Sequence, residues 1–436
     1  MKEDKTQHWK NSQLGDLAEY INGRAFKPTE WRKTGLPIVR IQNLNNDSIE
    51  YNYTTGSYED RYVVKKGDLL FAWAASIGVY IWKKDKAWLN QHIFKVIPKP
   101  FIDKLYLYYL LGTLIDRFYS ESHGSGMVHI TKNKFTQILV KYPPLTEQRA
   151  IVAKLETLLS ELDNAVATLK QAKEQIKTYR QAVLKAAFTG KLTEEWRKQK
   201  SEDLIWEELT TRNLFEFITS GSRGWARYYA DQGALFIRIG NLDHGTIDLD
   251  LNNKQHVNPP IGAEGTRTKV IADDILISIT ADVGMVALIP ENFEESYINQ
   301  HIALARPDKC KIHPRYLAWY LTSPVGQKQF QDLRKGATKV GLGLDDIKAI
   351  IVRVPKIEEQ LLIINIIESR FSTADQLEQT IDDSLIKTEA LKQSLLKQAF
   401  EGKLLTEQEL EQTRQAPDWE PAEKLLERIS STKKRS

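Results

Sequence analysis

The chain has 436 residues, of which 42% are hydrophobic and 27% charged, and its formal net charge is +4, all ordinary values for a globular protein. The single cysteine, Cys310, excludes an internal disulfide and favours a reducing, cytoplasmic location. The first ten residues are polar and no apolar run approaches the ~20 residues of a membrane span, so neither a secreted nor a membrane protein is expected.

Residues 1–142 are predicted to form a mixed α/β globular domain. The strand-like runs Pro37–Ile41 and Asp68–Trp73 alternate with loops rich in Gly, Asn and Asp. Leucines and tyrosines at helical spacing predict a packed helix over Tyr106–Tyr119. Residues 1–143 contain 21 Lys and Arg against 14 Asp and Glu, which favours a nucleic-acid partner for this segment.

Residues 143–200 are predicted to be a region built on one long helix. The motif Pro-Pro-Leu-Thr-Glu-Gln opens it at residue 143, and Ala-Phe-Thr-Gly-Lys-Leu closes it at residue 192. Thr146 is the expected N-cap and Gly190 the expected stop. Apolar residues at alternating spacings of four and three indicate the seam of a coiled coil. The seam comprises Ile151, Leu155, Leu158, Leu162, Leu169, Ile176, Val183 and Phe188.

Residues 201–354 are predicted to be a second domain that repeats the first. Ile38–Leu44 matches Phe236–Leu242, and Asn90-Gln91-His92 matches Asn299-Gln300-His301. The offset between matched residues drifts from 198 to 209 within the domains and is 212 throughout the helix. Loops that vary in length on a constant scaffold are how one fold changes its target. Residues 201–355 contain 17 Lys and Arg against 20 Asp and Glu, so their net charge does not indicate which kind of partner they bind.

Residues 355–410 are predicted to contain a second long helix, and residues 411–436 a charged, solvated tail. Pro355, Glu359-Gln360 and Ala399–Leu404 repeat the first helix motifs 212 positions later. The predicted seam of this copy is rougher, and Thr388 interrupts it. It comprises Ile363, Ile367, Phe371, Leu377, Ile381, Leu391, Leu395 and Phe400.

Polar, basic and aromatic loops at corresponding places in the two domains are the candidates for nucleic-acid contact. Arg and Lys suit guanine edges or phosphates, while Ser, Thr and Asn suit either. For any single residue an ordinary solvated loop explains the sequence as well as contact does, so the pairing of the loops carries the prediction. The candidates in the first domain are Asn22, Arg24, Phe26, Lys27, Ser125, Thr131 and Lys132. Those in the second domain are Ser220, Ser222, Arg223, Trp225, Arg227, Lys335, Thr338 and Lys339.

The sequence shows no nucleophile–base constellation and no metal-ligand spacing, so neither a catalytic nor a metal site is predicted. Asn258-Pro259-Pro260 is similar to the base-gripping loop of adenine methyltransferases, which leaves a stand-alone adenine-N6 DNA methyltransferase as an alternative. Ile261 stands where that loop has an aromatic residue, so a chance turn is favoured. His92 and His301 each follow Asn-Gln, a context that favours buried structural histidines over catalytic ones. A coiled-coil scaffold without any nucleic-acid role is the third reading.

Two variable domains, each followed by a Pro-Pro-Leu-x-Glu-Gln helix that ends Ala-Phe-x-Gly-Lys-Leu, resemble the specificity subunit of type I restriction-modification enzymes. The resemblance covers the chain from about Leu14 to Leu405. The second copy departs from the pattern in having one proline, Pro355, at its helix start. It also has Asp273 where the first copy has Gly67.

This resemblance implies an α+β fold in which two target recognition domains are joined and separated by two long helices. The helices would form an antiparallel coiled coil, and the whole would be a pseudo-twofold internal repeat. Each domain would read one half of a bipartite site in double-stranded DNA, and the helices would dock two modification subunits that bind S-adenosylmethionine. A complex that also contains two restriction subunits uses ATP and magnesium. The specificity subunit itself is expected to be non-catalytic and to hold no cofactor.

Overall fold

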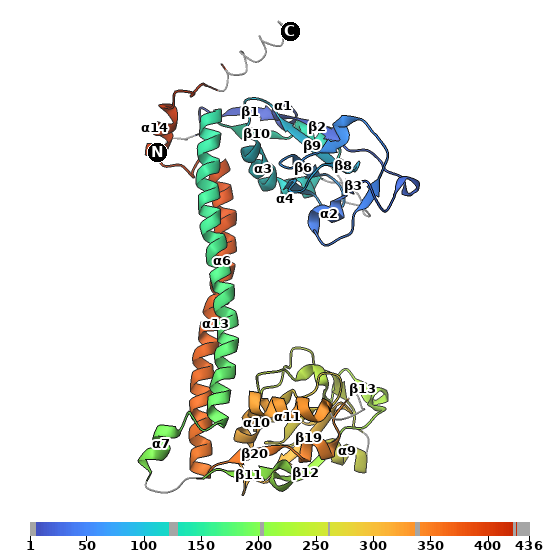
Figure 1. Ribbon diagram of the computed structural model, residues 1–436, viewed down its shortest axis with the longest axis vertical. Coiled ribbons are helices and arrows are strands. Elements are labelled where there is room, and N and C mark those ends of the chain that lie inside the picture. Colours follow the sequence, from blue (N-terminus) through green and yellow to red (C-terminus); the bar gives the residue numbers. More distant parts are fainter. Residues whose placement is uncertain are drawn as a thin grey trace. The chain divides into compact units, whose positions relative to one another are not determined.

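The computed structural model describes residues 6–121, 130–200, 205–259, 262–335, 341–421 and 424. The chain divides into two compact units, the first formed by Met1–Ala167 and Leu385–Ser436 and the second by Thr168–Ser384. In each unit one globular domain lies beside part of both long helices (Figure 1). We call the globular part that precedes the first long helix domain 1 and that of the second unit domain 2.

Domain 1 contains two four-stranded sheets and one separate pair of strands. Its strands are β1 Lys10–Gln13, β2 Ala18–Asn22, β3 Leu36–Val39, β4 Asn52–Thr54, β5 Val63–Val64, β6 Leu69–Ala72, β7 Gly78–Ile81, β8 Ala87–Leu89, β9 Ile93–Pro98 and β10 Leu139–Tyr142. The order β2-β9-β6-β7 is antiparallel throughout, the order β4-β3-β8-β5 includes the parallel pair β3–β8, and β1 pairs with β10. Its α-helices are α1 Leu14–Leu17, α2 Ile41–Asn45, α3 Lys104–Thr113, α4 Ile115–Glu121 and α5 Lys132–Gln137, with 3-10 turns at Pro28–Glu30 and Asp60–Tyr62.

Domain 2 repeats this plan, except that the fourth strand of its second sheet lies at the opposite edge, where β13 pairs with β15. Its strands are β11 Glu207–Thr210, β12 Phe215–Ser220, β13 Tyr229–Ala230, β14 Ala234–Ile237, β15 His256–Val257, β16 Ile275–Ser278, β17 Val286–Leu288, β18 Ser296–Ile298, β19 Ile302–Pro307 and β20 Ile351–Val354. The sheets have the orders β12-β19-β16-β17 and β13-β15-β14-β18, and β11 pairs with β20. Its α-helices are α8 Thr211–Leu214, α9 Ala263–Thr268, α10 Pro314–Thr322, α11 Pro324–Lys335 and α12 Leu344–Lys348, with 3-10 turns at Trp225–Tyr228 and Ile239–Asn241.

The matching order of the first sheet, and of three strands of the second, confirms the predicted mixed fold and internal repeat. The parallel pair β14–β18 of domain 2 takes the place of β3–β8, and antiparallel β12–β19 takes the place of β2–β9. The single helix predicted over Tyr106–Tyr119 is wrong in detail, because α3 ends at Thr113 and α4 begins at Ile115. Domain 2 has the same break between α10 and α11.

The phenylalanine of each Ala-Phe-x-Gly motif joins a long helix to a domain core. Phe188 is 1% exposed and packs edge-on against Tyr316 and Tyr320 of α10, with ring centroids 5.3 and 5.2 Å apart. In the first unit, the ring centroid of Phe400 lies 5.2 Å from that of Tyr106 in α3. Aromatic contacts of this kind are worth ~0.5–1.5 kcal/mol beyond the burial of area, so the motif holds each helix end to its domain.

The two long helices, α6 Leu145–Phe188 and α13 Ile357–Phe400, each have 44 residues, which confirms the predicted equal length. They run antiparallel in both units: Lys392 pairs with Asp163 in the first, and Lys173 with Asp382 at 2.7 Å in the second. Gly190 ends α6 with φ +81°, as predicted. The short helices α7 Glu194–Gln199 and α14 Glu407–Arg414 follow the long ones.

The predicted seam is only partly buried, and Thr146 is not the N-cap, because α6 already begins at Leu145. Leu377 and Leu391 are 54% and 46% exposed, so their placement in the seam is wrong. Leu377 lies at an open groove lined by Ile176 and Tyr179, beside small Ala172 and Ala374 that leave the helix pair unfilled there. The buried members are Ile151, Leu155, Val183, Phe188, Ile363, Ile367, Phe371 and Ile381. The half-buried members are Leu158, Leu162, Leu169, Ile176, Leu395 and Phe400.

None of the described helices combines the length and the apolar character that a membrane span requires. Cys310 is exposed and free.

Candidate nucleic-acid interface

The first predicted loop of domain 1 lies directly on the Asn90–His92 turn between β8 and β9. The backbone N of Gly23 donates to the carbonyl oxygen of Ile93 at 3.1 Å. A Cβ at Gly23 would lie 2.1 Å from the carbonyl oxygen of Asn90, closer than any real side chain approaches. Glycine is required at this position because two backbones meet there.

Domain 2 repeats this contact with different side chains. The backbone N of Gly221 donates to the carbonyl oxygen of Ile302 at 3.2 Å, and a Cβ at Gly221 would lie 2.0 Å from that of Asn299. Ser222 forms an isolated parallel β-bridge with Asn299, as Arg24 does with Asn90. The predicted correspondence of the two loops is therefore confirmed at the level of the backbone.

The later loop of domain 1 reaches the same edge of the sheet. The backbone N of Trp73, after β6, donates to the carbonyl oxygen of His92 at 3.2 Å, and that of Ile130 donates to Trp73 at 3.1 Å. Lys132 then donates from Nζ to the carbonyl oxygen of Tyr20 at 2.8 Å. The structure thus brings the two predicted loops of this domain together.

The corresponding bonds recur in domain 2. The backbone N of Ile279 donates to the carbonyl oxygen of His301 at 3.0 Å, and that of Leu342 donates to Ile279 at 2.8 Å. Three chain segments therefore meet at one sheet edge in each domain. Loops gathered on a rigid sheet edge are a common location for binding residues.

Arg24 is held by the protein itself. Its guanidinium forms two hydrogen bonds with Glu30, at 2.8 and 3.1 Å, and lies 4.1 Å from the ring centre of Tyr58. These hydrogen bonds from Arg24, with one from the backbone N of Lys27, lower the pKa of Glu30 to about 2. Arg24 must leave Glu30 before it can bind DNA through its full fork of donors.

The Arg24–Glu30 pair predicts a pH-dependent contribution to stability. A carboxylate with a lowered pKa stabilises the folded state above its unfolded value of ~4.3 and loses that contribution as the pH falls towards its folded value. The difference in unfolding temperature between the wild type and Glu30→Gln should be largest above pH ~5 and shrink steadily below pH ~4. Thermal melts across this range test it, and a difference that does not vary with pH would contradict it.

Phe26 and Trp225 are corrections to the predicted set. Phe26 is 8% exposed and packs in a small core with Ile38 and Trp88, while Trp225 is 2% exposed and stacks 5.1 Å from Phe236. An aromatic ring buried in this way has almost no face left for a base. Both residues support their loops from below, which an aromatic residue in a polar loop does not reveal by sequence alone.

Several predicted residues do lie at the surface. Lys27, Arg223 and Arg227 are exposed, and the Arg227 guanidinium lies 4.8 Å from the ring centre of Tyr228. Asn22 is exposed, but its Oδ1 accepts a hydrogen bond from Trp73 Nε1 at 3.2 Å. Lys27, Arg223 and Arg227 can therefore reach phosphates or bases without first breaking an ion pair that the structure shows.

The remaining predicted residues divide into two groups. Thr131 is the N-cap of α5, and its Oγ1 accepts from the backbone N of Lys134. Lys335 is the last residue of α11. Ser125, Thr338 and Lys339 lie outside the described residues.

Arg267 is a residue that the sequence reasoning missed. From the end of α9 it donates to Thr219 Oγ1 at 2.8 Å, to the carbonyl oxygen of Ser220 at 3.1 Å and to Ser222 Oγ. It therefore holds the predicted loop of domain 2 at three points. Arg61 stands at the matching position of domain 1, 206 residues earlier, but it pairs with Glu59 instead, so the repeat alone did not reveal the role of Arg267.

The repeated Glu-Gln motif attaches each long helix to a domain. Gln148 is fully buried; its Nε2 donates to the carbonyl oxygens of Pro143 at 2.8 Å and Phe101 at 3.1 Å, and its Oε1 accepts from the backbone N of Asp103 at 2.8 Å. Gln360 makes matching bonds to Pro355 and His313, each at 2.8 Å. Satisfied buried amides of this kind fix a unique geometry between helix and domain.

The glutamates of the motif are buried charges with matching partners. Glu147 is 3% exposed and accepts from Trp9 Nε1 at 2.8 Å, with His8 Nε2 at 2.6 Å. Glu359 is 1% exposed and accepts from Trp206 Nε1 at 3.1 Å. Two further partners complete that cluster: Thr193 Oγ1 at 2.6 Å and an ion pair with Arg197.

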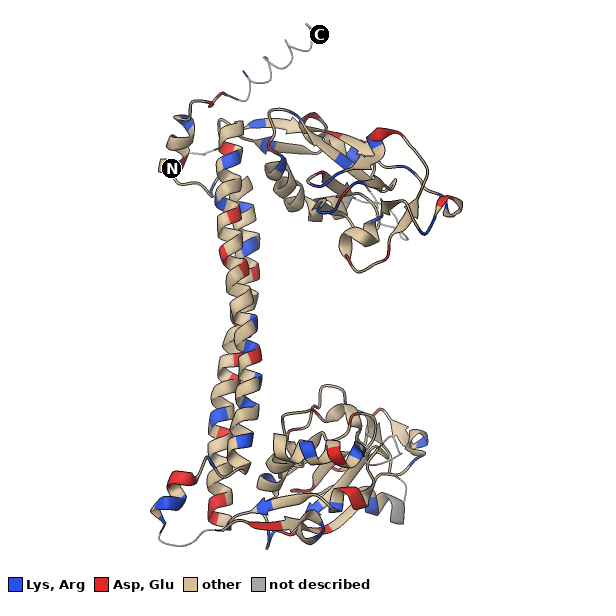
Figure 2. Cartoon of the chain, in the orientation of Figure 1, with Lys and Arg blue, Asp and Glu red and all other residues tan. Residues whose placement is uncertain are grey.

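The long helices carry both signs of charge along their length, with blue and red residues interspersed (Figure 2). Such a mixed surface lacks the continuous basic stripe that tracks a nucleic-acid backbone. The sheet edges of the domains remain the better candidates for the interface. Within the described ranges, no group of three or more His, Cys, Asp or Glu side chains is placed to hold a metal ion.

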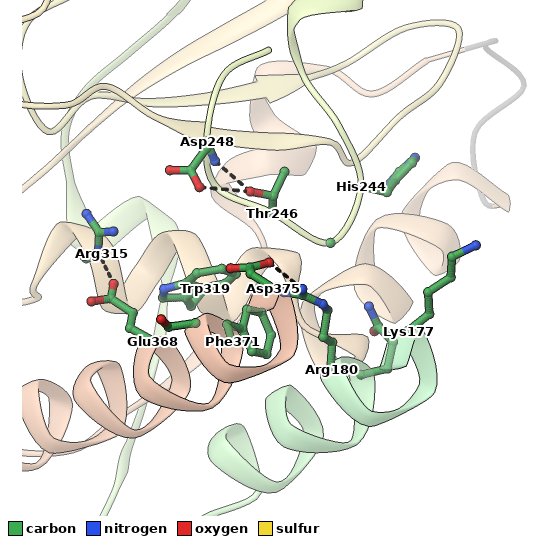
Figure 3. Close-up of a pocket in the computed structure, with 13 residues that line it drawn as sticks. Lys177, Arg180, His244, Thr246, Asp248, Arg315, Trp319, Glu368, Phe371 and Asp375 are labelled. Carbon is green, nitrogen blue, oxygen red and sulfur yellow. Dashed lines mark hydrogen bonds and ion pairs between the residues drawn. The ribbon is translucent and has the colours of Figure 1, made fainter. Parts of the chain in front are cut away.

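A pocket of about 630 Å³ in the second unit separates the loop carrying His244, Thr246 and Asp248 from the paired helices (Figure 3). Its lysine and arginines are paired: Arg180 with Asp375, Arg315 with Glu368 and Lys177 with Glu174. This pairing leaves the pocket without the excess positive charge that a phosphate-bearing ligand requires.

Asn258, the first residue of the Asn-Pro-Pro sequence of the methyltransferase alternative, directly follows strand β15. The backbone N of Asn258 donates to the carbonyl oxygen of Tyr228 at 2.9 Å, directly after β15 pairs with β13. Pro260 and Ile261 lie outside the described residues. This context does not favour a base-gripping loop.

Comparison with known proteins assigns a family. A profile of the type I restriction modification DNA specificity domain matches residues 6–178 and 227–386. The chain is 29% identical to the type I restriction enzyme EcoBI specificity subunit of Escherichia coli, over 97% of this chain and 92% of that one. It is 23% identical to the MjaVIII specificity subunit of Methanocaldococcus jannaschii, over 85% and 89% of the two chains.

Solved structures share the fold. One of them comes from a structure described as showing the basis of complex assembly and conformational transition of the type I R-M system. It aligns with a TM-score of 0.66 at 20% identity, and the alignment covers 91% of this chain and 98% of that one. The HsdS subunit from Thermoanaerobacter tengcongensis aligns with a TM-score of 0.54 at the same identity and coverage.

Proposed function

Because the chain belongs to the type I restriction modification DNA specificity family, as a specificity subunit, we propose that domains 1 and 2 each read one half of a bipartite site in double-stranded DNA. The observation that carries the proposal is the loop-on-turn contact repeated at Gly23 and Gly221, with the same backbone and different side chains. One scaffold that presents different loops suits two different half-sites.

The helices supply the surface for partner subunits in this proposal. The groove lined by Ile176, Tyr179, Leu377 and Ile381 exposes apolar side chains that one partner would bury. The partners are two modification subunits, which bind S-adenosylmethionine and methylate the DNA. Two restriction subunits, which use ATP and magnesium, complete a nuclease. The chain itself contributes recognition and no chemistry.

Methylation mapping in cells with and without the gene tests the proposal. A split adenine-methylation motif should be present with the gene and absent without it. Purified chain that transfers methyl groups to DNA without partners would instead support the methyltransferase alternative. Absence of sequence-dependent DNA binding in the assembled complex would support a scaffold.

Replacement of Arg223 and Arg227 by Ala should affect only the half-site read by domain 2. Both side chains are exposed and project from the loop that packs on the Asn299–His301 turn. Each true base contact should cost ~1–3 kcal/mol and relax one base position. Binding assays on DNA altered in either half-site measure this, and an equal loss at both would count against two separate reading domains.

Arg267→Ala should relax the same half-site through the position of the loop. The three hydrogen bonds from Arg267 to residues 219–222 disappear, and the loop loses its fixed conformation. We expect a loss of discrimination of ~1–3 kcal/mol with little change in unfolding temperature. Arg212→Ala, at another exposed arginine of domain 2, is the matched control and should leave discrimination unchanged.

A further inference from the structure

Two buried atoms of the Asn90–His92 turn, Gln91 Oε1 and His92 Nδ1, have no hydrogen-bond partner among the residues of domain 1 that the structure describes. The two side chains are themselves half-buried, so the turn reaches the surface beside the first predicted loop. Buried polar atoms without partners destabilise a fold and are rare in native proteins. Such atoms at a binding edge point to a ligand that supplies the missing partners.

The histidine of the same turn has its missing partner within domain 2. Thr280 Oγ1 lies 2.6 Å from His301 Nδ1, and Asn299 Oδ1 accepts from the backbone N of His301 at 3.0 Å. Neither Gln300 Oε1 nor His301 Nδ1 is a buried atom without a partner. The two turns therefore share a sequence and differ in whether the protein supplies a partner to the Nδ1 atom of the histidine.

The difference comes from one side chain. Ala74 is the equivalent of Thr280, because each is followed by an alanine with positive φ, Ala75 at +59° and Ala281 at +57°. Each also follows a residue whose backbone N donates to the histidine carbonyl oxygen. Domain 1 thus lacks the hydroxyl that completes the turn in domain 2.

The unpartnered atoms form a pair with defined chemistry. Gln91 Nε2 lies 3.3 Å from His92 Nε2, so the amide nitrogen donates to the ring nitrogen; with the amide turned over, the ring nitrogen donates to the amide oxygen instead. Whichever way the amide is oriented, one donor and one acceptor remain on the two side chains. In the major groove, adenine presents the complementary set, its N7 acceptor and its N6 amino donor.

The turn is also linked to the first loop. The ring of Trp73 packs edge-on against His92, with centroids 5.2 Å apart, and its Nε1 donates to Asn22 Oδ1. A shift of the loop on binding DNA would therefore also displace the turn, because Trp73 contacts both.

We propose that Gln91 and His92 read an adenine edge in the half-site of domain 1, and that Thr280 withdraws His301 from base reading in domain 2. This inference rests on the proposed function. It makes the hydroxyl at the position of Ala74 and Thr280 a determinant of specificity, although that hydroxyl need not touch DNA.

Methylation mapping with the chain and its modification subunits tests the inference. Ala74→Ser adds the hydroxyl that domain 2 has, with one added heavy atom. We expect discrimination at one adenine position of one half-site to fall about tenfold or more, while the other half-site keeps its sequence. Gln91→Leu, which removes both amide atoms at similar volume, should relax the same position.

Thr280→Ser keeps the hydroxyl of domain 2 and is the control that should leave both half-sites unchanged. Thermal unfolding of the purified variants checks that they fold, and if Ala74→Ser does not, Gln91→Leu carries the test. Wild-type discrimination at every position in Ala74→Ser and Gln91→Leu, or equal losses in both half-sites, would overturn the inference. Absence of any motif that depends on the wild-type chain would overturn the proposed function, and this inference with it.

Discussion

Removal of one heptad from each long helix, residues 164–170 of α6 and 384–390 of α13, should abolish methylation at the native half-site spacing. The chain passes between the two units only at Ala167–Thr168 and Ser384–Leu385, and both crossings lie within these helices. The deletion shortens each helix by ~10 Å and rotates it by only ~20°. A new motif with a spacer shorter by about three base pairs is expected.

The deletion is matched so that pairing survives on both sides of it. The pairs Asp163–Lys392 and Lys173–Asp382 flank the removed residues and stay in register. Methylation mapping reads the spacing, and thermal melts confirm that both units remain folded. Deletion of the heptad from α6 alone breaks this register and serves as the control. Continued methylation at the native spacing in the matched deletion would refute the idea that helix length sets the spacing.

Arg197→Met should destabilise the second unit by ~3 kcal/mol or more. Glu359 is 1% exposed, and Arg197 is the cation that pairs with its carboxylate. Removal of one partner from a buried ion pair costs ~3–5 kcal/mol, because the other charge stays buried without compensation. The partial exposure of Arg197, 22% of its side chain, places the expected value at the lower end of this range. Denaturant unfolding of the purified chain measures it.

The double variant Arg197→Met with Glu359→Gln is the control for this prediction. The neutral amide retains the hydrogen bond to Thr193 and leaves no buried charge, so most of the stability should return. Trp9→Phe in the first unit removes only one donor to Glu147 and should cost ~1–3 kcal/mol. A full loss of stability in the double variant would mean that Arg197 acts through packing rather than charge.

The repeat and the long helices could be predicted because their signals are local. Apolar residues at spacings of three and four and a constant offset of 212 define two equal helices, which the structure has at 44 residues each. The Glu-Gln and Ala-Phe-x-Gly motifs lie at the two ends of each long helix, as predicted. Their physical role could not be predicted, since Gln148 binds residues around Asp103 and Glu147 binds Trp9, and these pairings lie 45 and 138 residues apart.

The candidate interface was predicted at the level of loops and less well at the level of side chains. Phe26 and Trp225 looked like surface aromatics, but they fill small cores that form only when distant strands pair. Arg267 was missed because its hydrogen bonds reach 45 to 48 residues back along the chain. Leu377 and Leu391 fit a heptad pattern and are exposed, because the pattern does not say how closely two helices pack.

The composition of the first unit has a consequence for synthesis on the ribosome. Trp9 shares its core with Leu404, Leu405 and Leu410, so the first unit needs residues that are made before and after those of the second unit. The second unit is one continuous segment, Thr168–Ser384. Domains fold as units while the chain emerges. The second unit is therefore complete before the first, and a nascent or truncated chain exposes the apolar surface around Trp9 until residues 404–410 arrive.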